Sequence, residues 1–445
     1  MSSASRIPPG PRGLALVQAI RFLRRDPLNA MLSFAREYGD LVHLGEGPLH
    51  IYMVNHPDLV RDLLVGHAAR LRKPRSTTRP VIDFLGSGLL VSEGALWRSE
   101  RHTMQPVFHH RVIDAYGQEM VACIDAVLAG WHAGDVHDID EEMLKMTLAM
   151  VTRTLFRANV QDAEEMVVRA VKVLQKVSYQ QGQLGLPIPR WLPLPGNRQK
   201  WHYIDELDVL VARIIQSGRA AGHESGNMIA MLAAGIDQPD SVMTERLLRD
   251  EVMTVLLAGH ESTANGLTWM WYLLTQHPEV QEQLRAEAEA VLEGRPPTVA
   301  DFKRLTYAEN VVKEALRLYP PAWALPREPL EDIALGDYTL KQGSMVIAAP
   351  YVIHRDPRFY PQPDAFIPER FDTDQDTSPF AYIPFGAGPR FCVGTAFAQM
   401  AMRMVLVRVQ QGFRLTLVPG ERVGLDPLLT LRPTNGVHIQ MQRWN

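Results

Sequence analysis

The sequence predicts a mainly α-helical protein with small β-sheets. Four stretches repeat apolar residues at the three- and four-residue spacing of amphipathic helices: residues 112–131, 141–156, 163–181 and 203–219. Alternating apolar residues, punctuated by Gly, Asp and Pro, are confined to three short regions: 41–54, 333–347 and 413–440. Strand and helix patterns do not alternate along the chain, which excludes a doubly wound parallel sheet.

Composition places the chain among globular proteins and excludes some classes of binding partner and metal site. The 445 residues are 46% hydrophobic and 22% charged, which excludes intrinsic disorder. A net charge of -4 provides no overall positive field for a nucleic acid. The two cysteines, Cys123 and Cys392, are too few for a disulfide scaffold or a four-cysteine metal site. We therefore expect a reducing, cytoplasmic location.

Two apolar segments could suggest a membrane protein, but neither pattern supports one. The run at residues 14–20 is too short and is interrupted by Gln18, so no membrane anchor is expected. Residues 252–276 carry one charge, Glu261, at the centre of the polar cluster 260–265, where lipid tolerates it least. This pattern predicts a long buried helix whose polar middle lines a cavity.

That polar cluster does not form a known zinc motif. His260 and Glu261 begin like the HExxH helix of zinc proteases, but the fifth position is Ala264, so the second ligand is missing. Small residues before Glu261 and hydroxyls after it would let a ligand approach the helix backbone. The alternative is a carboxylate that neighbouring hydroxyls simply satisfy.

A second pair of charges lies three residues apart on a predicted helix. Glu314 and Arg317 therefore share a helix face, and Arg370 follows in a proline-rich stretch. A surface ion pair is the alternative interpretation.

The strongest signal is a glycine-rich loop at residues 385–394 that contains Cys392 and leads into an apolar helix at 395–409. Unpaired N–H groups near a helix start favour thiolate over thiol, and a thiolate can bind a metal. Gly386 and Gly388 permit backbone angles closed to other residues. A buried, inert cysteine is the alternative, and it suits Cys123 on an apolar helix face better.

These three segments, in this order, resemble the signature motifs of the cytochrome P450 superfamily, in its soluble bacterial form. Residues 385–394 resemble the haem-binding loop, 258–263 the oxygen-activating segment, and 314–317 the ExxR motif, with Arg370 as its usual partner. The resemblance implies the P450 fold, with haem between the long central I helix and the Cys-loop/L helix. It also implies one domain over residues 1–445, although length alone suggests about three.

The resemblance assigns roles to individual residues. Cys392 would be the axial ligand of the iron in haem b (iron protoporphyrin IX). Phe385 and Gly394 would pack close to the haem, and Trp97, Arg101, Arg327 and Arg390 would bind its propionates. Glu261 and a following hydroxyl would deliver protons for oxygen activation. The family usually has threonine directly after the acid; here Ser262 stands there with Thr263 behind it, so either could serve. Glu314, Arg317 and Arg370 would form a structural ion network.

The resemblance also implies a largely apolar substrate pocket. Such a pocket favours a lipophilic small molecule such as a fatty acid, terpenoid, steroid or polyketide. The proline-rich loop at 186–196, around Trp191, is expected to cover its entrance. The expected pocket residues are Phe84, Leu89, Leu90, Val255, Leu256, Ala258, Ala322, Leu325 and Leu429.

The predicted reaction is a monooxygenation that inserts one atom of O₂ into the substrate, by hydroxylation or epoxidation. No flavin or ferredoxin segment fits in the chain, so electrons are expected from a separate ferredoxin or flavodoxin with its reductase, and the protein is expected to be a monomer. The alternatives are a haem-thiolate peroxygenase or an isomerase or dehydratase, none of which needs a redox partner, and a haem-based sensor or carrier. Glu261 and Ser262 argue against the isomerase and peroxygenase classes, because enzymes that do not split O₂ have little use for a proton relay.

Overall fold

The structure is a computed structural model, and it describes residues 7–47, 49–184, 188–222, 227–236, 238, 241–372 and 378–444. Its internal contacts divide the chain into two compact units. Unit 1 contains the described parts of Met1–Thr78, Arg317–Phe366 and Asp374–Cys392. Unit 2 contains those of Arg79–Leu316, Ile367–Thr373 and Val393–Asn445.

Unit 1 is built on a five-stranded sheet in the order β1-β2-β8-β5-β3. The strands pair antiparallel except for β2 and β8, which run parallel. A hairpin of β6 and β7 shares the same apolar core, in which Leu41, Tyr52 and Leu335 are buried together. The strands are β1 Leu41–Glu46, β2 Leu49–Val54, β3 Leu71–Arg72, β5 Leu325–Pro329, β6 Ile333–Leu335, β7 Tyr338–Leu340 and β8 Met345–Ala348.

Among the described residues, four α-helices lie wholly within unit 1. They are α1 Leu14–Arg25, α2 Pro27–Tyr38, α3 Pro57–Arg61 and α15 Pro350–Ile353. The Asp26 carboxylate accepts a hydrogen bond of 3.2 Å from the backbone N–H of Asn29 at the start of α2, and Pro27 occupies the first helical position. The short helix α15 follows β8 directly and contacts α2.

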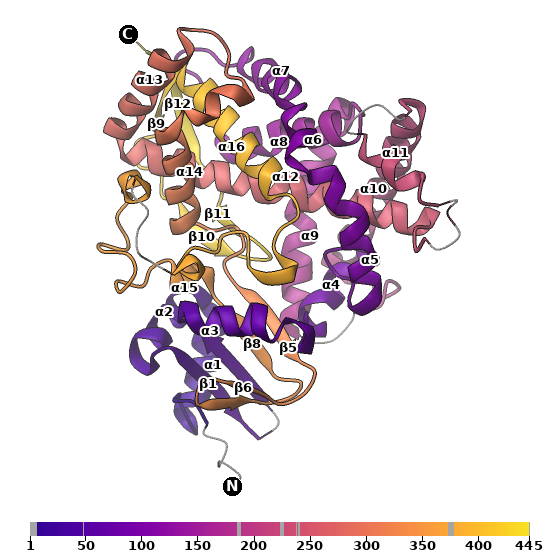
Figure 1. The fold of residues 1–445 in the computed structure, drawn as a ribbon, viewed down its shortest axis with the longest axis vertical. Coiled ribbons are helices and arrows are strands. Elements are labelled where there is room, and N and C mark those ends of the chain that lie inside the picture. Colours follow the sequence, from indigo (N-terminus) through magenta and orange to yellow (C-terminus); the bar gives the residue numbers. More distant parts are fainter. Residues whose placement is uncertain are drawn as a thin grey trace. The chain divides into compact units, whose positions relative to one another are not determined.

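Unit 2 is mostly helical, and its longest helix, α12, packs against α8, α10 and α16 (Figure 1). Two helices cross the boundary between the units: α4 begins, and α14 ends, with residues of unit 1. The helices are α4 Arg75–Leu85, α5 Gly94–Met104, α6 His110–Asp114, α7 Gly117–Leu128, α8 Ile139–Leu155, α9 Glu164–Leu184, α10 Pro195–Ala220, α11 Met228–Ala233, α12 Glu245–Gln276, α13 Pro278–Leu292, α14 Thr306–Leu318 and α16 Thr395–Gln410.

Two small antiparallel sheets complete unit 2. One has the order β4-β12-β9, and the other is the hairpin of β10 and β11. The Trp269 side chain on α12 donates a hydrogen bond of 3.0 Å to the Leu431 carbonyl, which seats the hairpin on this helix. The strands are β4 Val136–Asp138, β9 Phe413–Leu417, β10 Gly424–Pro427, β11 Leu431–Thr434 and β12 His438–Arg443.

The predicted central helix is confirmed as α12, a 32-residue helix that begins seven residues before the predicted start, at Glu245. Its N-cap Thr244 accepts a hydrogen bond of 3.1 Å from the Leu247 N–H, and it ends before the His277-Pro278 pair. From Asp250 to Trp271 nearly every residue is buried, as expected for a helix inside a protein. None of the described helices combines the length and the apolar character that crossing a membrane requires.

Two predicted elements need correction. The helix expected at 112–131 is divided into α6 and α7, because the chain turns at the buried Tyr116 before Gly117, where a Cβ would lie 2.8 Å from Val299 Cγ2. The loop expected at 186–196 ends earlier than predicted. Its residues 186 and 187 lie outside the described residues, and Pro195 already forms the first turn of α10, a position that suits proline.

Candidate active site

One small face of α12 is not buried. Between Asp250 and Trp271 the partly exposed residues are Ala258, Gly259 and Ser262, which lie on one side of the helix because they are spaced three and four apart. Side chains no larger than serine line this face, so it leaves space in the middle of an otherwise buried helix. This partly exposed face lies beside the polar cluster of unit 2, and its small side chains would let a flat group approach the helix backbone.

The structure distinguishes the two hydroxyls that follow Glu261. Ser262 belongs to the partly exposed face, whereas Thr263 is only 3% exposed. Each hydroxyl donates a hydrogen bond to the carbonyl four residues earlier, over 2.7 Å from Ser262 to Ala258 and 2.9 Å from Thr263 to Gly259. Of these two, the serine oxygen combines this anchoring with access to the open face.

Glu261 is buried, and its side chain is held by polar partners. Thr430 Oγ1 donates to Glu261 Oε1 at 2.6 Å, and Asn265 Nδ2 donates to the same oxygen. Burial raises the pKa of this carboxyl, although Thr430 and the Arg432 guanidinium oppose that rise. The protonated form of Glu261 is thus favoured relative to that of a solvent-exposed glutamate.

His260, next to that acid, is fully buried. Burial lowers the pKa of this imidazole to about 4, so the ring is neutral at pH 7. Its Nδ1 lies within hydrogen-bonding distance of the Leu256 carbonyl one turn earlier. His260 therefore behaves as a structural residue of the helix core.

The glycine-rich loop of unit 1 presents Cys392 at the surface of the chain. Gly386 and Gly388 have φ of 76° and 71°, and a Cβ on Gly388 would lie 2.1 Å from the Leu64 carbonyl oxygen, so only glycine fits there. The Cys392 N–H donates to the Phe385 carbonyl at 3.0 Å. The cysteine lies three residues before α16, whose N-cap is Gly394.

The other cysteine is chemically unsuited to bind a metal. Cys123 is fully buried on α7, and burial raises the pKa of its thiol to about 11. A thiolate is the form that ligates metal, and it is strongly disfavoured there. Of the two thiols, the one at Cys392 is exposed and therefore has the access that a metal ligand requires.

The predicted propionate ligands come from both units. Trp97 and Arg101 lie one turn apart on α5, and both are partly buried. Arg327 lies on β5 and donates to the Pro326 carbonyl at 2.8 Å, while Arg390 ends the 3₁₀ turn before the cysteine.

Within unit 2 the structure brings together two members of the predicted ion network. Arg370 Nε donates to Glu314 Oε1 at 3.2 Å, and the Ile367 N–H donates to the same oxygen at 2.9 Å. The Glu314 side chain is fully buried and that of Arg370 is 6% exposed. Arg370 is thereby fixed against α14.

Arg317 binds backbone carbonyls of unit 1. Its guanidinium donates to the carbonyls of His354 and Pro363, both at 2.7 Å, and to that of Ala365 at 3.0 Å. The buried His354 has Nδ1 3.1 Å from the Arg317 carbonyl and accepts from the Ile383 N–H at 2.9 Å through Nε2. The sequence did not predict this role of His354. Its position in a proline-rich segment gave no indication of it.

The predicted pocket residues differ in exposure. Phe84 and Val255 are buried, Leu256 is fully buried, and Ala258 lies on the open face of α12. Leu90 and Leu429 are exposed. The remaining three, Leu89, Ala322 and Leu325, are partly buried.

A buried lysine fixes the helix that carries Phe84. Lys200 Nζ on α10 donates to Asp83 Oδ2 at 2.6 Å, to Gln181 Oε1 at 2.8 Å and to the Pro80 carbonyl at 3.2 Å. All three ammonium hydrogens thus have acceptors, which explains how this fully buried charge is tolerated. The residues Pro80 and Asp83 of α4 are tied to α9 and α10.

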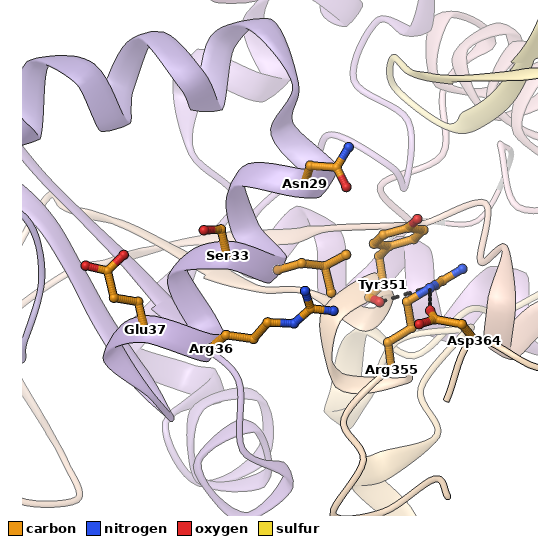
Figure 2. Close-up of a pocket in the computed structure, with 8 residues that line it drawn as sticks. Asn29, Ser33, Arg36, Glu37, Tyr351, Arg355 and Asp364 are labelled. Atoms are coloured by element: carbon orange, nitrogen blue, oxygen red, sulfur yellow. Dashed lines mark hydrogen bonds and ion pairs between the residues drawn. The ribbon is translucent and has the colours of Figure 1, made fainter. Parts of the chain in front are cut away.

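A polar pocket in unit 1 lies outside the predicted site. Figure 2 shows Arg36 on α2 extending toward Tyr351 and Arg355. The Arg355 guanidinium stacks on the Tyr351 ring at 3.8 Å, and its Nε lies 3.4 Å from Asp364 Oδ1. None of the lining residues is a predicted site residue, and Arg355 is held as a structural cation between α15 and its neighbours.

The comparison that decides the family is a single match over nearly the whole chain. The family model described as Cytochrome P450 matches residues 8–439. The chain belongs to the cytochrome P450 family. Its mainly helical structure with small sheets is that of the family, and the predicted P450 fold is confirmed.

Three relatives of this P450 come from Streptomyces. Cyclooctatin synthase of Streptomyces melanosporofaciens is 34% identical and covers 95% of this chain and 92% of its own length. Cyclooctat-9-en-7-ol 5-monooxygenase of the same species is 31% identical over 92% of this chain and 90% of its own. Pentalenene oxygenase of Streptomyces avermitilis is 31% identical over 92% and 91%.

Family membership establishes the class of reaction. This P450 uses haem and is a monooxygenase, an oxidoreductase that incorporates oxygen. It acts on a lipophilic substrate with O₂ and electrons from a redox partner. The predicted reaction class and cofactor are thereby confirmed.

Proposed function

We propose that this P450 oxygenates a terpenoid and binds its haem iron through Cys392. The observation that carries the proposal is the contrast between the exposed thiol at Cys392 and the buried thiol at Cys123, whose pKa is about 11. A metal-binding cysteine must reach its metal and exist as thiolate, and Cys392 meets the first condition where Cys123 meets neither.

The other haem contacts follow the family motifs. Phe385 and Gly394 flank the cysteine and would pack along the haem, while Trp97, Arg101, Arg327 and Arg390 would bind its propionates through N–H donors. When bound, the haem supplies the iron at which O₂ is reduced and split. Glu314, Arg317 and Arg370 have a structural role in the proposal, which their burial and their backbone partners support.

Proton delivery in the proposal depends on Glu261 and Ser262. Burial raises the pKa of the Glu261 carboxyl, which favours its protonated form, and Ser262 belongs to the partly exposed face of α12. Thr263 is the second candidate hydroxyl, and its burial argues against it. The relay favours a monooxygenase over a peroxygenase, an isomerase or a dehydratase.

The substrate class is proposed from the relatives and the pocket. Two relatives are named for reactions on pentalenene and cyclooctat-9-en-7-ol, which are cyclic alkenes, and a terpenoid is the predicted class that fits them. Trp191, 78% exposed, belongs to the loop proposed to cover the entrance. The proposed contacts, nearly all apolar, are Phe84, Leu89, Leu90, Val255, Leu256, Ala258, Ala322, Leu325 and Leu429.

The remaining proposals concern partners and organisation. We propose a ferredoxin or flavodoxin with its reductase as electron donor, and no nucleic-acid partner. One family model spans both structural units, which supports a single domain over residues 1–445. A cytoplasmic location suits a thiol that must stay reduced. The proposed monomer is testable by the elution volume in size-exclusion chromatography.

The ligand assignment is tested by the spectrum of the reduced protein with carbon monoxide. We expect the red-shifted Soret band of a thiolate-bound haem in the wild type and in Cys123→Ser, the matched control. Cys392→Ser should lack the band. A band of unchanged position and height in Cys392→Ser would contradict the assignment, and product formed with peroxide as efficiently as with a surrogate ferredoxin system would favour the peroxygenase.

A further inference from the structure

The carboxyl of Glu261 is anchored through one of its two oxygens. Thr430, in the loop between β10 and β11, donates to Oε1 at 2.6 Å, and Asn265, one turn along α12, donates to the same atom. The Gln175 side chain also favours the carboxylate form of Glu261 by hydrogen bonding. The carboxyl is therefore oriented through Oε1, which favours Oε2 as the oxygen that carries the proton.

The hydroxyl that anchors this acid is itself oriented. Gln175 Nε2 on α9 donates to Thr430 Oγ1 at 3.1 Å, and Asn265 Nδ2 donates to it at 3.0 Å. A hydroxyl offers two lone pairs and one hydrogen. With both lone pairs occupied, the hydrogen of Thr430 is directed at Glu261 Oε1, 2.6 Å away, which is a closer acceptor than Gln175 Oε1 at 3.4 Å.

The charged groups around the carboxyl partly cancel. Arg432 on β11 favours the carboxylate, but its own partner is the buried Asp140 of α8, at 3.1 Å. His260 is neutral and faces the Leu256 carbonyl. Gln175 on α9 favours the carboxylate by a side-chain hydrogen bond and carries no charge. The neutral hydrogen-bond donors therefore decide how readily Glu261 gives up its proton.

We propose that Gln175 and Thr430 are positioning residues that orient Glu261 for proton delivery, which rests on the proposed role of Glu261. The proton leaves Oε2, and the carboxylate that remains is stabilised by the donors on Oε1. A proton from solvent water then restores the acid. Gln175 and Thr430 act through Glu261 and are not catalytic residues themselves.

This arrangement links the acid to elements far away in the sequence. Thr430 directly follows Leu429, a proposed substrate contact, and Gln175 belongs to the helix that Lys200 ties to α4. A shift of α9 or of the β10–β11 loop would loosen the anchor on Oε1. The ease with which Glu261 gives up its proton thus depends on the positions of α9 and of the β10–β11 loop.

The test measures Glu261 directly, in the oxidised holoprotein without turnover. The infrared C=O band of its protonated carboxyl is identified by its loss in Glu261→Gln and is followed against pH. Thr430→Val removes the hydroxyl at nearly constant volume, and Thr430→Ser restores it. Thr434→Val is the matched control, because its hydroxyl accepts from the Gly424 N–H at the other end of the hairpin.

Removing a donor to the carboxylate should raise the pH midpoint of the band by about one unit in Thr430→Val. Gln175→Leu removes a smaller contribution to the same carboxyl and the bond that orients Thr430, so it should raise the midpoint less. It is the variant to use if Thr430→Val does not fold. Thr430→Ser and Thr434→Val should keep the wild-type midpoint. A midpoint in Thr430→Val and Gln175→Leu equal to that of Thr434→Val would overturn the proposal, as would the absence of any band that Glu261→Gln removes.

A turnover measurement supplies the link to function. Product formed per NADPH, followed against pH with a surrogate ferredoxin system, should shift in Thr430→Val in the same direction as the band and return in Thr430→Ser. A profile that stays at the wild-type position while the band shifts would overturn the link to proton delivery. A missing carbon monoxide band in the wild type would instead refute the Cys392 assignment, and the infrared midpoint would be unaffected.

Discussion

His354 Nε2 accepts a hydrogen bond of 2.9 Å from the backbone N–H of Ile383, in the segment that leads to the cysteine loop. Its Nδ1 lies 3.1 Å from the carbonyl of Arg317, so the proton of the neutral ring is on Nδ1. One buried imidazole thereby ties the end of the ExxR motif to the chain that presents Cys392. Burial and the nearby Arg317 lower the pKa of this histidine to about 3.

This lowered pKa predicts a loss of stability in acid. Below pH 6.5 the unfolded chain protonates His354 while the folded protein does not, so the stability it contributes is present above pH 6.5 and is lost as the pH falls toward 3. His354→Gln keeps a donor and an acceptor but does not titrate. Between pH 6 and 4.5 its free energy of unfolding should fall less steeply than that of wild type, by about 1.4 kcal/mol per pH unit. Equal slopes in urea titrations would contradict the prediction.

Replacement of Ser262 should uncouple electron use from product formation. Because this hydroxyl stands on the open face of α12, Ser262→Ala should raise the peroxide released per NADPH several-fold. The control is Thr263→Val, whose buried hydroxyl donates to the Gly259 carbonyl and whose peroxide yield should stay near wild type. The reverse pattern would assign the relay to Thr263.

The effects of replacing the buried residues Glu314 and Arg370 on the free energy of unfolding should be strongly coupled. Glu314→Gln leaves a buried guanidinium without its counter-charge and should lower the free energy of unfolding by about 3 kcal/mol. Arg370→Met removes this guanidinium from the buried carboxylate of Glu314 and should also be destabilising. The double variant should be more stable than the sum of the single effects predicts, as denaturant titration of all four proteins would reveal. Additive effects would show that the pair does not interact.

Gly388 should tolerate no side chain. In Gly388→Ala the Cβ would meet the Leu64 carbonyl oxygen at 2.1 Å, in addition to the strain of a φ of 71°. Gly420 is a matched control, because its φ is 84° but no atom of the described chain lies within 4 Å of its Cβ position. We expect Gly420→Ala to lose about 1 kcal/mol of stability and Gly388→Ala clearly more, about 3 kcal/mol. Similar losses would indicate that backbone strain alone is the cause.

The buried Lys200 should control how substrate leaves. Lys200→Met removes the bonds to Asp83, Gln181 and the Pro80 carbonyl, and so releases the part of α4 that carries Phe84. The dissociation rate of a bound terpenoid, measured by the return of the low-spin iron spectrum, should rise several-fold. Lys172→Met, which cuts a partly exposed pair with Glu141, is the control. Equal terpenoid dissociation rates in Lys200→Met and Lys172→Met would show that the Lys200 hydrogen bonds do not affect the substrate pocket.

Part of the site could be predicted from sequence because its residues are neighbours in the chain. The glycines beside Cys392 and the polar centre of α12 are local patterns, and together they are sufficient to indicate the family. Local patterns do not resolve which hydroxyl, Ser262 or Thr263, reaches the open face, because that depends on how the helix is turned against its neighbours. Gln175, Thr430 and His354 carried no sequence signal for their roles, since each depends on a partner remote in the sequence.

The sequence alone determined the helical class and the reaction type and predicted which thiol binds the iron, because these depend on residue chemistry and on spacing within one segment. The tertiary structure decided the environment of each site residue. It buried Cys123 and exposed Cys392, placed Thr430 against Glu261, and neutralised His354 between Arg317 and Ile383. Desolvation and hydrogen bonding act over a few ångströms in space, regardless of separation along the chain, and only the folded chain specifies those distances.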